Sequence, residues 1–413
     1  MERHYLKRGL EERLIELFKV FPVVVVSGAR QVGKSTLLEH AYPNISRVVF
    51  DPSIDIENAR ADPELFLNHR KPPVILDEIQ YAPELVSTIK RRLEKERPPG
   101  QYLLTGSQQW GVMKLLAESL AGRAVFLDLD GFSLQEISDT TPGSSWLGEW
   151  LTKSSEDFVM KCSRLKLPGT LFETIWRGSL PEAQFLEIQN IPPFHAAYLR
   201  TYVERDVRLL AEISDLQSFA RFFRLCGALT AQEINYSEIG RELGLTPQTA
   251  HRWLDLLKAT YQWYEIPPYS GNTIKRISTK GKGYLSDTGL ACFGQAISTP
   301  DAISAHPLWG SLFETLMVSQ VRKQCQLLNP PPILYHWRSH GGAEVDLLLE
   351  YNGKFYPIEV KGNSRPTGHD TRGIQAFREA YPHLKIEKGL VIAPAESAHP
   401  LSEDVVVIPW DLQ

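Results

Sequence analysis

A short stretch near the amino end combines glycine, lysine and serine in a spacing that suits phosphate binding. The residues are Gly28, Ala29, Arg30, Gln31, Val32, Gly33, Lys34, Ser35 and Thr36. An apolar run at 23–26 precedes them and a helix is expected at 34–40, which is the setting of a P-loop. Glycines let N–H groups turn around phosphate oxygens, and the helix start adds positive potential. We expect these residues to bind a nucleotide, with Lys34 at the β- and γ-phosphates and Ser35 on Mg²⁺. A buried strand that ends in a glycine-rich turn is the alternative.

Two acidic residues end a second apolar run. Asp77 and Glu78 follow Val, Ile and Leu at 74–76. We expect Asp77 to hold the Mg²⁺ shell and Glu78 to polarise the attacking water; a strand edge that meets solvent is the alternative. Ser107 ends a strand expected at 102–107, between the two strands just described. Its hydroxyl could contact the water or the γ-phosphate, or it is an ordinary turn serine.

The elements that would position these residues alternate between strand and helix. Strands are expected at 23–27, 47–51, 74–78 and 102–107, and an amphipathic helix at 85–96. This alternation predicts an α/β fold with a parallel sheet covered by helices on both faces. A chain of 413 residues is too long for one ordinary core, so further domains are expected.

Composition narrows the classes of partner and compartment. The net charge of −4 gives no overall attraction to nucleic acid, so such a contact would need a local basic patch. No apolar run approaches the length of a membrane span, and no signal-peptide core is found at the amino end. The cysteines form no C-x-x-C pair, which argues against structural zinc and a disulfide framework. A cytoplasmic location without a membrane partner is therefore expected.

Residues 236–247 have the pattern of a helix, a glycine turn and the start of a second helix. We expect Ser237 to cap the first helix and Thr246 the second, with Pro247 at its first position. Polar side chains of the second helix would then point outward, namely Gln248, Thr249 and Arg252, with His251 as a further candidate. This pattern is typical of a helix-turn-helix, and the basic segment 273–282 could form a wing that contacts DNA phosphates. A winged helix that packs proteins together is the alternative.

Charged residues recur near the carboxyl end. Strands are expected at 344–350 and 355–361, joined by the turn Asn352-Gly353. This hairpin and the preceding helix would bring together Glu314, Asp346, Glu359 and Lys361. The three carboxylates could hold Mg²⁺, with Asp346, Glu359 and Lys361 as the catalytic set. The arrangement resembles the PD-(D/E)XK restriction-endonuclease-like fold, which implies a nuclease, although the same fold can survive as a binding scaffold.

The P-loop, the acid pair and the strand that ends at 107 together resemble the AAA+ ATPases. The resemblance is strongest to a prokaryotic branch of archaeal-type ATPases with a C-terminal domain of unknown function, whose pattern residues 120–123 and 198–207 share. It implies ATP and Mg²⁺ as ligands, a homo-oligomer with ATP at subunit contacts, and an arginine finger. Arg123 is the first candidate for the finger and Arg205 the second; an ion-paired surface arginine is the alternative.

These observations divide the chain into an AAA+ P-loop ATPase domain (1–138), a helical lid or connector (139–215), a winged-helix domain (216–300) and a PD-(D/E)XK nuclease-like domain (301–413). The predicted function is that of an oligomeric, ATP-hydrolysing protein that acts on or with DNA. The alternative is a nucleotide-switched assembly or partner-binding protein whose nuclease-like part is inactive. A pure transcriptional regulator is disfavoured, because operator binding does not need the hydrolytic acid pair.

Overall fold

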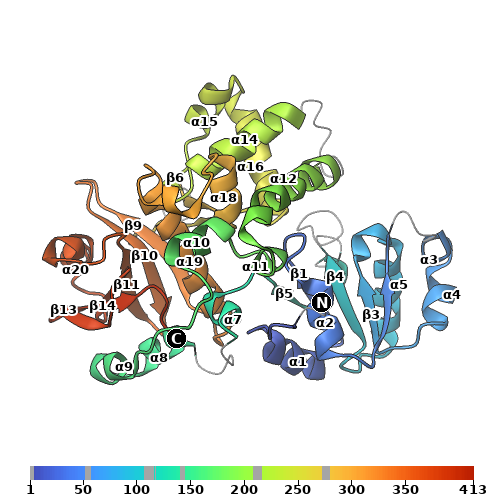
Figure 1. The fold of residues 1–413 in the computed structure, drawn as a ribbon. Helices are drawn as coiled ribbons and strands as arrows, with labels where there is room; N and C mark the ends of the chain where they lie inside the picture. The colour runs from blue at the N-terminus through green and yellow to red at the C-terminus, as the bar shows by residue number, and fades with distance from the viewer. Residues whose placement is uncertain are drawn as a thin grey trace.

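The computed structural model describes residues 4–51, 57–106, 116, 118–139, 145–207, 216–271 and 280–413, with only the backbone at residues 57, 155 and 204–206. Figure 1 shows a sheet with its helices as one lobe, in blue and cyan, and a second sheet as another lobe, in orange and red. Most of the green and yellow helices lie above and between the two lobes, whereas the green helices at 146–161 lie below the second lobe.

The amino-terminal lobe contains a five-stranded parallel sheet in the order β2-β3-β4-β1-β5. The strands are β1 (Val23–Ser27), β2 (Ser46–Val49), β3 (Val74–Asp77), β4 (Tyr102–Gly106) and β5 (Ala124–Asp128). The valine run of β1 reflects burial on both faces, since Val24 and Val26 join one core cluster and Val23 and Val25 another. The predicted parallel α/β sheet is confirmed, and β4 lies between β3 and β1 as expected.

Helices cover both faces of this sheet. The core on the Val24 side includes residues of α1 (Glu11–Val20) and α2 (Lys34–Ala41). The core on the Val23 side includes residues of α3 (Glu57–Ala61), α4 (Pro63–Asn68), the 3-10 turn η1 (Ile79–Tyr81) and α5 (Glu84–Lys95). Because the strands are parallel, the loops that follow β1, β3 and β4 meet at one edge of the sheet, where functional side chains can gather.

The middle of the chain is mostly helical. Its first helices are α7 (Leu134–Ile137), α8 (Trp146–Thr152), α9 (Ser155–Lys161), α10 (Leu171–Arg177), α11 (Pro181–Gln184), η2 (Ile188–Asn190) and α12 (Ile191–Thr201), which continues as the π-helical turn η3 (Tyr202–Val207). The helices α14 (Leu216–Ala228), α15 (Tyr236–Leu243), α16 (Pro247–Ala259) and α18 (Thr288–Gly294) follow, together with a small sheet in the order β6 (Gln232–Glu233), β8 (Lys282–Leu285), β7 (Trp263–Ile266).

The helix-turn-helix segment has caps that differ in part from the prediction. Thr246 caps α16 through the Thr249 N–H, and Gly244 ends α15 in the left-handed region with φ 67°. The cap of α15 is Asn235, which accepts from the Glu238 N–H, so the prediction of Ser237 as the cap was wrong. The helix begins two residues earlier than a cap at Ser237 would give, and this places Ser237 inside its first turn.

The carboxyl-terminal lobe is a six-stranded mixed sheet in the order β13-β14-β12-β11-β10-β9. Its elements are η4 (Pro300–Ile303), α19 (Trp309–Gln326), β9 (Ile333–Arg338), β10 (Glu344–Tyr351), β11 (Lys354–Val360), η5 (Gly368–Thr371), α20 (Arg372–Ala380), β12 (Gly389–Ala393), β13 (His399–Ser402) and β14 (Val405–Pro409). The β10–β11 turn places Asn352 and Gly353 at φ 51° and 71°, as a two-residue hairpin requires.

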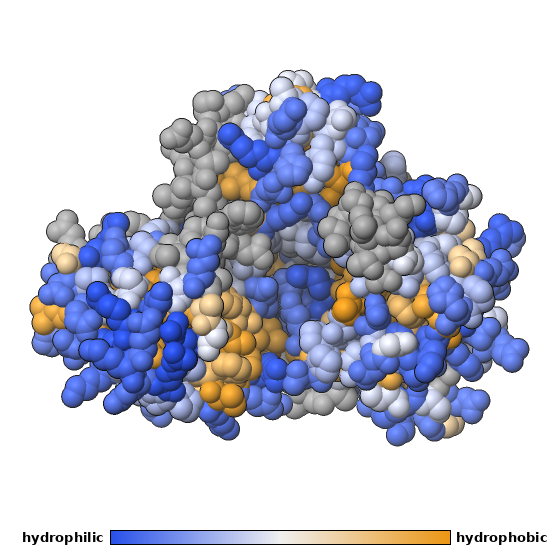
Figure 2. Space-filling view, turned by 180° about the vertical axis from the view of Figure 1, so that it is seen from behind, coloured by the Kyte–Doolittle hydropathy of each residue, from blue (hydrophilic) through white to orange (hydrophobic). Residues whose placement is uncertain are grey.

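Direct contacts join the three parts. Helix α19 reaches the loop after β5, where Lys323 Nζ donates to the Phe132 carbonyl at 2.8 Å. Backbone bonds join Tyr269 to β9, with 2.6 Å from its N–H to the His336 carbonyl oxygen. Figure 2 shows the parts around a central hollow, with an apolar area on the amino-terminal lobe beside it. Within the described ranges, no helix is both long and apolar enough to span a bilayer.

Candidate functional site

The P-loop carbonyls are engaged by side chains of three different elements. Lys34 Nζ donates to the carbonyls of Gly28 and Ala29 at 3.1 and 2.8 Å. The Tyr198 hydroxyl of α12 donates to the Arg30 carbonyl at 3.3 Å, and Arg8 Nη1 donates to the Val32 carbonyl at 2.8 Å. A loop whose carbonyls are held in this way can offer its N–H groups to an anion.

A cavity of about 640 Å³ opens beside this loop. Its lining comes from the loop and α2, the amino-terminal segment, the residue after β3, the chain after β5, and the region of α11 and α12. These residues are Gln31, Gly33, Lys34, Ser35, Thr36, His40, His4, Tyr5, Leu6, Arg8, Glu78, Phe132, Pro181, Glu182, Phe185 and Phe194. The Tyr5 ring stacks on His40 with centroids 3.7 Å apart. The volume falls in the range of small-molecule sites, and the aromatic residues add flat apolar surface beside the phosphate-type loop.

Asp77 accepts hydrogen bonds from several side chains at the carboxyl ends of the strands, where Mg²⁺ is expected. The Ser35 hydroxyl donates to Asp77 Oδ1 at 3.0 Å, and the Thr105 hydroxyl donates to the same oxygen. Arg47 Nε donates to Asp77 Oδ2 at 3.1 Å. A buried carboxylate beside a serine hydroxyl is a donor set that fits Mg²⁺, which prefers one or two carboxylates with substrate phosphates.

Glu78 lies at the cavity in an unusual backbone conformation. Its φ of 60° and ψ of 47° turn the chain just after β3. The Glu78 N–H donates to the Thr105 hydroxyl at 2.9 Å, and Gln80 Nε2 donates to the Glu78 carboxylate. Thr105 therefore fixes both acids at once, a role that the sequence analysis missed although it included Thr105 in its strand.

Arg8 supports the loop from outside the sheet. Its side chain is 4% exposed, and its guanidinium pairs with Glu136 Oε1 at 3.1 Å and donates to the Asp130 carbonyl at 2.7 Å. It also lies over the Phe132 ring at 4.8 Å. No local pattern could reveal this role, because two of its partners lie more than a hundred residues away.

The other predicted ATPase residues are not gathered at this edge. Ser107 falls outside the described residues, and so does the side chain of Arg205. Arg123 precedes β5, whose first residue Ala124 pairs with Val23 at the start of β1, whereas the P-loop follows the end of β1. Arg123 instead lies 3.5 Å from Glu94 in an ion pair. Arg123 thus lies at the amino ends of the strands, whereas the P-loop of the same chain lies at their carboxyl ends.

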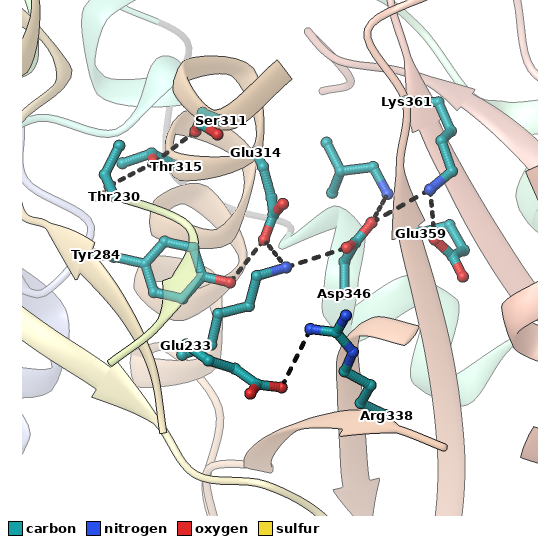
Figure 3. A network of polar contacts seen from close by, with 12 residues as sticks. Thr230, Glu233, Tyr284, Ser311, Glu314, Thr315, Arg338, Asp346, Glu359 and Lys361 are labelled. Atoms are coloured by element: carbon teal, nitrogen blue, oxygen red, sulfur yellow. Dashed lines mark hydrogen bonds and ion pairs between the residues drawn. The ribbon is translucent and has the colours of Figure 1, made fainter. Parts of the chain in front are cut away.

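The carboxyl-terminal lobe brings together most of its predicted charged residues. Lys361 Nζ lies 2.7 Å from Glu359 Oε2 and 3.6 Å from Asp346 Oδ2. The Val360 N–H donates to Asp346 Oδ2 at 2.9 Å. Glu314 of α19 reaches this group through Lys282 of β8, whose Nζ is 2.6 Å from Glu314 Oε1 and 3.2 Å from Asp346 Oδ1 (Figure 3).

The buried charges of this cluster perturb one another. Burial, and then the charge of Asp346, raises the pKa of Glu314 to about 7 and the pKa of Glu359 well above its usual value. Burial opposes ionisation of Asp346, but Lys282 and Lys361 outweigh it and lower the Asp346 pKa. Where side chains are described, no group of three or more His, Cys, Asp or Glu residues is arranged around a metal position. As it stands, the donor set around Lys282 does not fit a divalent ion.

Family models match the chain in three stretches. Residues 20–138 match a model described as "AAA domain". The amino-terminal lobe is a P-loop ATPase-like domain. Residues 169–301 match a domain of unknown function, DUF8612, and residues 309–412 match another, DUF4143. The first match supports ATP binding and hydrolysis by the lobe that holds the cavity.

Whole-chain relatives carry no assigned activity. Uncharacterized proteins of Mycobacterium bovis and Mycobacterium tuberculosis are each 27% identical over 407 residues, which is 98% of this chain and 84% of theirs. Among solved structures, a Walker-type ATPase of Pyrococcus abyssi is 15% identical, with 70% of this chain and 96% of that chain covered and a TM-score of 0.42. The RuvB Holliday junction branch migration motor of Thermotoga maritima is 14% identical over 63% of this chain and 90% of its own, with a TM-score of 0.30.

Proposed function

We propose that the protein hydrolyses Mg·ATP at the P-loop cavity and uses the nucleotide state to control assembly with partners. The observation that carries this proposal is the meeting of Ser35, Asp77 and Glu78 at the sheet edge beside a loop whose carbonyls are tied back. The match of residues 20–138 to an AAA domain supports the same chemistry.

Each group of the site has a role that follows from its contacts. Lys34 would exchange its carbonyl partners for phosphate oxygens, and the loop N–H groups would hold the same phosphates. Ser35 and Asp77 would hold Mg²⁺, which supplies positive charge to the phosphates. Glu78, positioned by Thr105 and Gln80, would accept a hydrogen bond from the attacking water and orient it.

Calorimetry and turnover test this proposal on the full chain. Mg·ATP should release or absorb measurable heat with the wild-type protein and none with Lys34→Ala, because the phosphates lose their ammonium partner. Glu78→Gln should keep ATP affinity within a few fold and reduce turnover by about a hundredfold or more, in the range of general-base removal. No heat with folded wild-type protein, or unchanged turnover in Glu78→Gln, would reject the assignment.

We further propose a homo-oligomer in which Arg123 acts on the nucleotide of a neighbouring subunit. Arg123 lies at the amino ends of the strands, away from the P-loop at their carboxyl ends, and this excludes action on its own P-loop in this conformation. In the described part of the chain, β5 forms one edge of the sheet, with Phe126 37% exposed and its neighbours Val125 and Leu127 partly so. Apolar edge strands favour pairing with other surfaces. Size-exclusion chromatography with light scattering, with and without a non-hydrolysable ATP analogue, tests the assembly.

DNA is proposed as a partner of the helix-turn-helix segment. Gln248 and Arg252 on α16 are exposed, as a recognition helix requires, although His251 and Lys258 are each paired with Asp255. Fluorescence anisotropy with duplex DNA should show salt-dependent binding that Arg252→Ala weakens. Binding that is insensitive to both salt and Arg252→Ala would assign the segment to protein packing.

The carboxyl-terminal lobe has two proposed roles. A metal-dependent nuclease is supported by Asp346, Glu359 and Lys361 on neighbouring strands. An inactive, partner-binding scaffold is favoured by Lys282, which lies where Glu314 and Asp346 would share a metal. Plasmid cleavage with Mg²⁺ or Mn²⁺ that disappears in Asp346→Ala and Glu359→Ala would establish the nuclease; no cleavage would leave the scaffold.

A further inference from the structure

The acidic cluster of the carboxyl-terminal lobe contains its own cation. The Lys282 side chain is 9% exposed, and its ammonium contacts Glu314 Oε1 at 2.6 Å and Asp346 Oδ1 at 3.2 Å. Both acids are buried as well, with 13% of the Glu314 side chain and 4% of the Asp346 side chain exposed. The lysine therefore lies between the oxygens that a metal would have to bridge.

The second oxygen of Asp346 and the Lys282-bound oxygen of Glu314 have further donors. Asp346 Oδ2 accepts from the Val360 N–H and lies 3.6 Å from Lys361 Nζ. Glu314 Oε1 also accepts from the Tyr284 hydroxyl at 2.7 Å. A divalent ion would have to displace these donors and approach two ammonium groups, which like-charge repulsion disfavours.

The ionisation of the group supports the same conclusion. Burial works against the charged form of Lys282, but Asp346 and Glu314 outweigh it and raise the Lys282 pKa. The Lys361 pKa is raised in the same way by Asp346 and Glu359, against the effect of burial. Burial raises the pKa of Glu314 and Glu359, whereas the two ammonium groups outweigh burial and lower the pKa of Asp346.

Lys282 belongs to a different part of the chain from the acids it contacts. It is on β8, the central strand of the small sheet, and its backbone pairs with Glu233 on one side and Ile266 on the other. Glu314 and Asp346 are on α19 and β10. Two further contacts join the middle part of the chain to the carboxyl-terminal lobe near the cluster. Glu233 lies 3.6 Å from Arg338, and the hydroxyls of Thr230 and Thr315 are 2.7 Å apart (Figure 3).

We propose that Lys282 is the resident cation of this cluster: it locks the middle part of the chain onto the carboxyl-terminal sheet and excludes divalent metal ions from Glu314 and Asp346. The apparent metal site is then an ionic joint between two parts of the molecule. This inference does not depend on ATP hydrolysis and is tested without nucleotide.

Titration of the full chain with Mn²⁺, followed by the electron paramagnetic resonance signal of free Mn²⁺, tests the exclusion. Wild-type protein should bind no Mn²⁺ at this cluster below about 1 mM, the weak end for oxygen-ligand sites. Lys282→Met keeps an unbranched side chain but removes the charge, and should gain one site at least tenfold tighter. Adding Glu314→Gln to Lys282→Met should abolish the gain. Lys258→Met is the matched control, since Lys258 is also ion-paired in the middle part but lies with Asp255 and Glu265.

Thermal unfolding tests whether Lys282 stabilises the contact between the middle part and the carboxyl-terminal sheet, and it also shows whether each variant is folded. Lys282→Met should melt below wild type without metal and gain stability with Mn²⁺, whereas Lys282→Arg, which keeps the charge, should not respond to Mn²⁺. Failure of a folded Lys282→Met to bind more Mn²⁺ than wild type would overturn the proposal. So would a wild-type melting temperature that rises with Mn²⁺ and loses this rise in Glu314→Gln, a result that needs no Lys282 variant.

Discussion

The Thr105 hydroxyl contacts two acids, Asp77 and Glu78, for which different roles are proposed. It donates to Asp77 and accepts from the Glu78 N–H at 2.9 Å, so it orients the carboxylate proposed to hold Mg²⁺ and the turn that carries the carboxylate proposed to direct water. It is fully buried at the end of β4. A hydroxyl in this place acts through its neighbours, and its loss should affect turnover more than binding.

Thr105→Val tests this role, because valine keeps the shape and removes both hydrogen bonds. We expect turnover to fall about tenfold, since a lost hydrogen bond to a charged group is worth about 1.5 kcal/mol. ATP affinity, measured by calorimetry, should change less than twofold. Thr105→Ser keeps the hydroxyl and should retain most of the turnover, whereas normal turnover in Thr105→Val would show that Asp77 and Glu78 are positioned without it.

At the scale of elements, the P-loop is held by the segment that precedes α1. Arg8 ties the Val32 carbonyl to Glu136 and to the Asp130 carbonyl, which belong to the chain after β5. The same chain segment receives α19, through Lys323 and through Arg322, which pairs with Asp130. The amino-terminal segment thus connects the nucleotide loop to the carboxyl-terminal lobe.

Arg8→Met should destabilise the protein and loosen the nucleotide site together. Removal of the guanidinium leaves Glu136 buried without its cation, at a cost of about 3 kcal/mol. We expect denaturant unfolding to show this loss and ATP affinity to fall severalfold. Lys7→Met, which removes an exposed ion pair one residue away, is the control and should leave both quantities unchanged. An Arg8→Met protein with wild-type affinity would separate the segment from the P-loop.

The sequence predicted the elements whose patterns are local and missed the contacts that join distant segments. The valine run, the glycine-rich loop and the Asn352-Gly353 turn have local signatures, and the sheet and hairpin formed as predicted. Gly28 shows what a local pattern misses. Its φ of 149° suits a glycine-rich loop, but glycine is also required because a Cβ there would lie 2.1 Å from the carbonyl oxygen of the distant Leu129. Lys282 lay at the edge of a predicted basic wing, and only tertiary packing turns its charge toward Glu314 and Asp346.

At the scale of the whole molecule, the buried His336 contributes to the response to acid. His336 lies on β9, where the middle part of the chain meets the carboxyl-terminal lobe. It is 4% exposed, and its backbone forms hydrogen bonds with Pro267 and Tyr269. Burial, and then the charge of Lys282, lowers the His336 pKa to about 4. Its neutral form is therefore stable in the fold, while the unfolded chain takes up a proton at about pH 6.5.

This shift predicts a loss of stability in acid. The contribution of His336 is fully present above pH 6.5 and is lost as the pH falls toward 4, by up to about 3 kcal/mol. His336→Gln cannot take up that proton, so its unfolding free energy should fall less steeply across this window. His340→Gln, at an exposed position in the same lobe, should follow the wild-type curve. Parallel curves for wild type and His336→Gln would contradict a neutral buried His336.

Arg123, the proposed finger, would connect the sheet to the proposed assembly, because an arginine at the strand ends opposite its own P-loop can act only on a neighbour's nucleotide. Arg123→Ala and Lys34→Ala should each lose most turnover, the first by loss of transition-state charge and the second by loss of nucleotide. In mixed oligomers, an intact P-loop of an Arg123→Ala subunit can meet the arginine of a Lys34→Ala subunit. We therefore expect mixing to restore a fraction of the ATPase rate, in proportion to the mixed species measured by native mass spectrometry. Mixed oligomers without any restored rate, or full turnover of assembled Arg123→Ala alone, would leave Arg123 as the ion-pair partner of Glu94 and would move the finger to another residue.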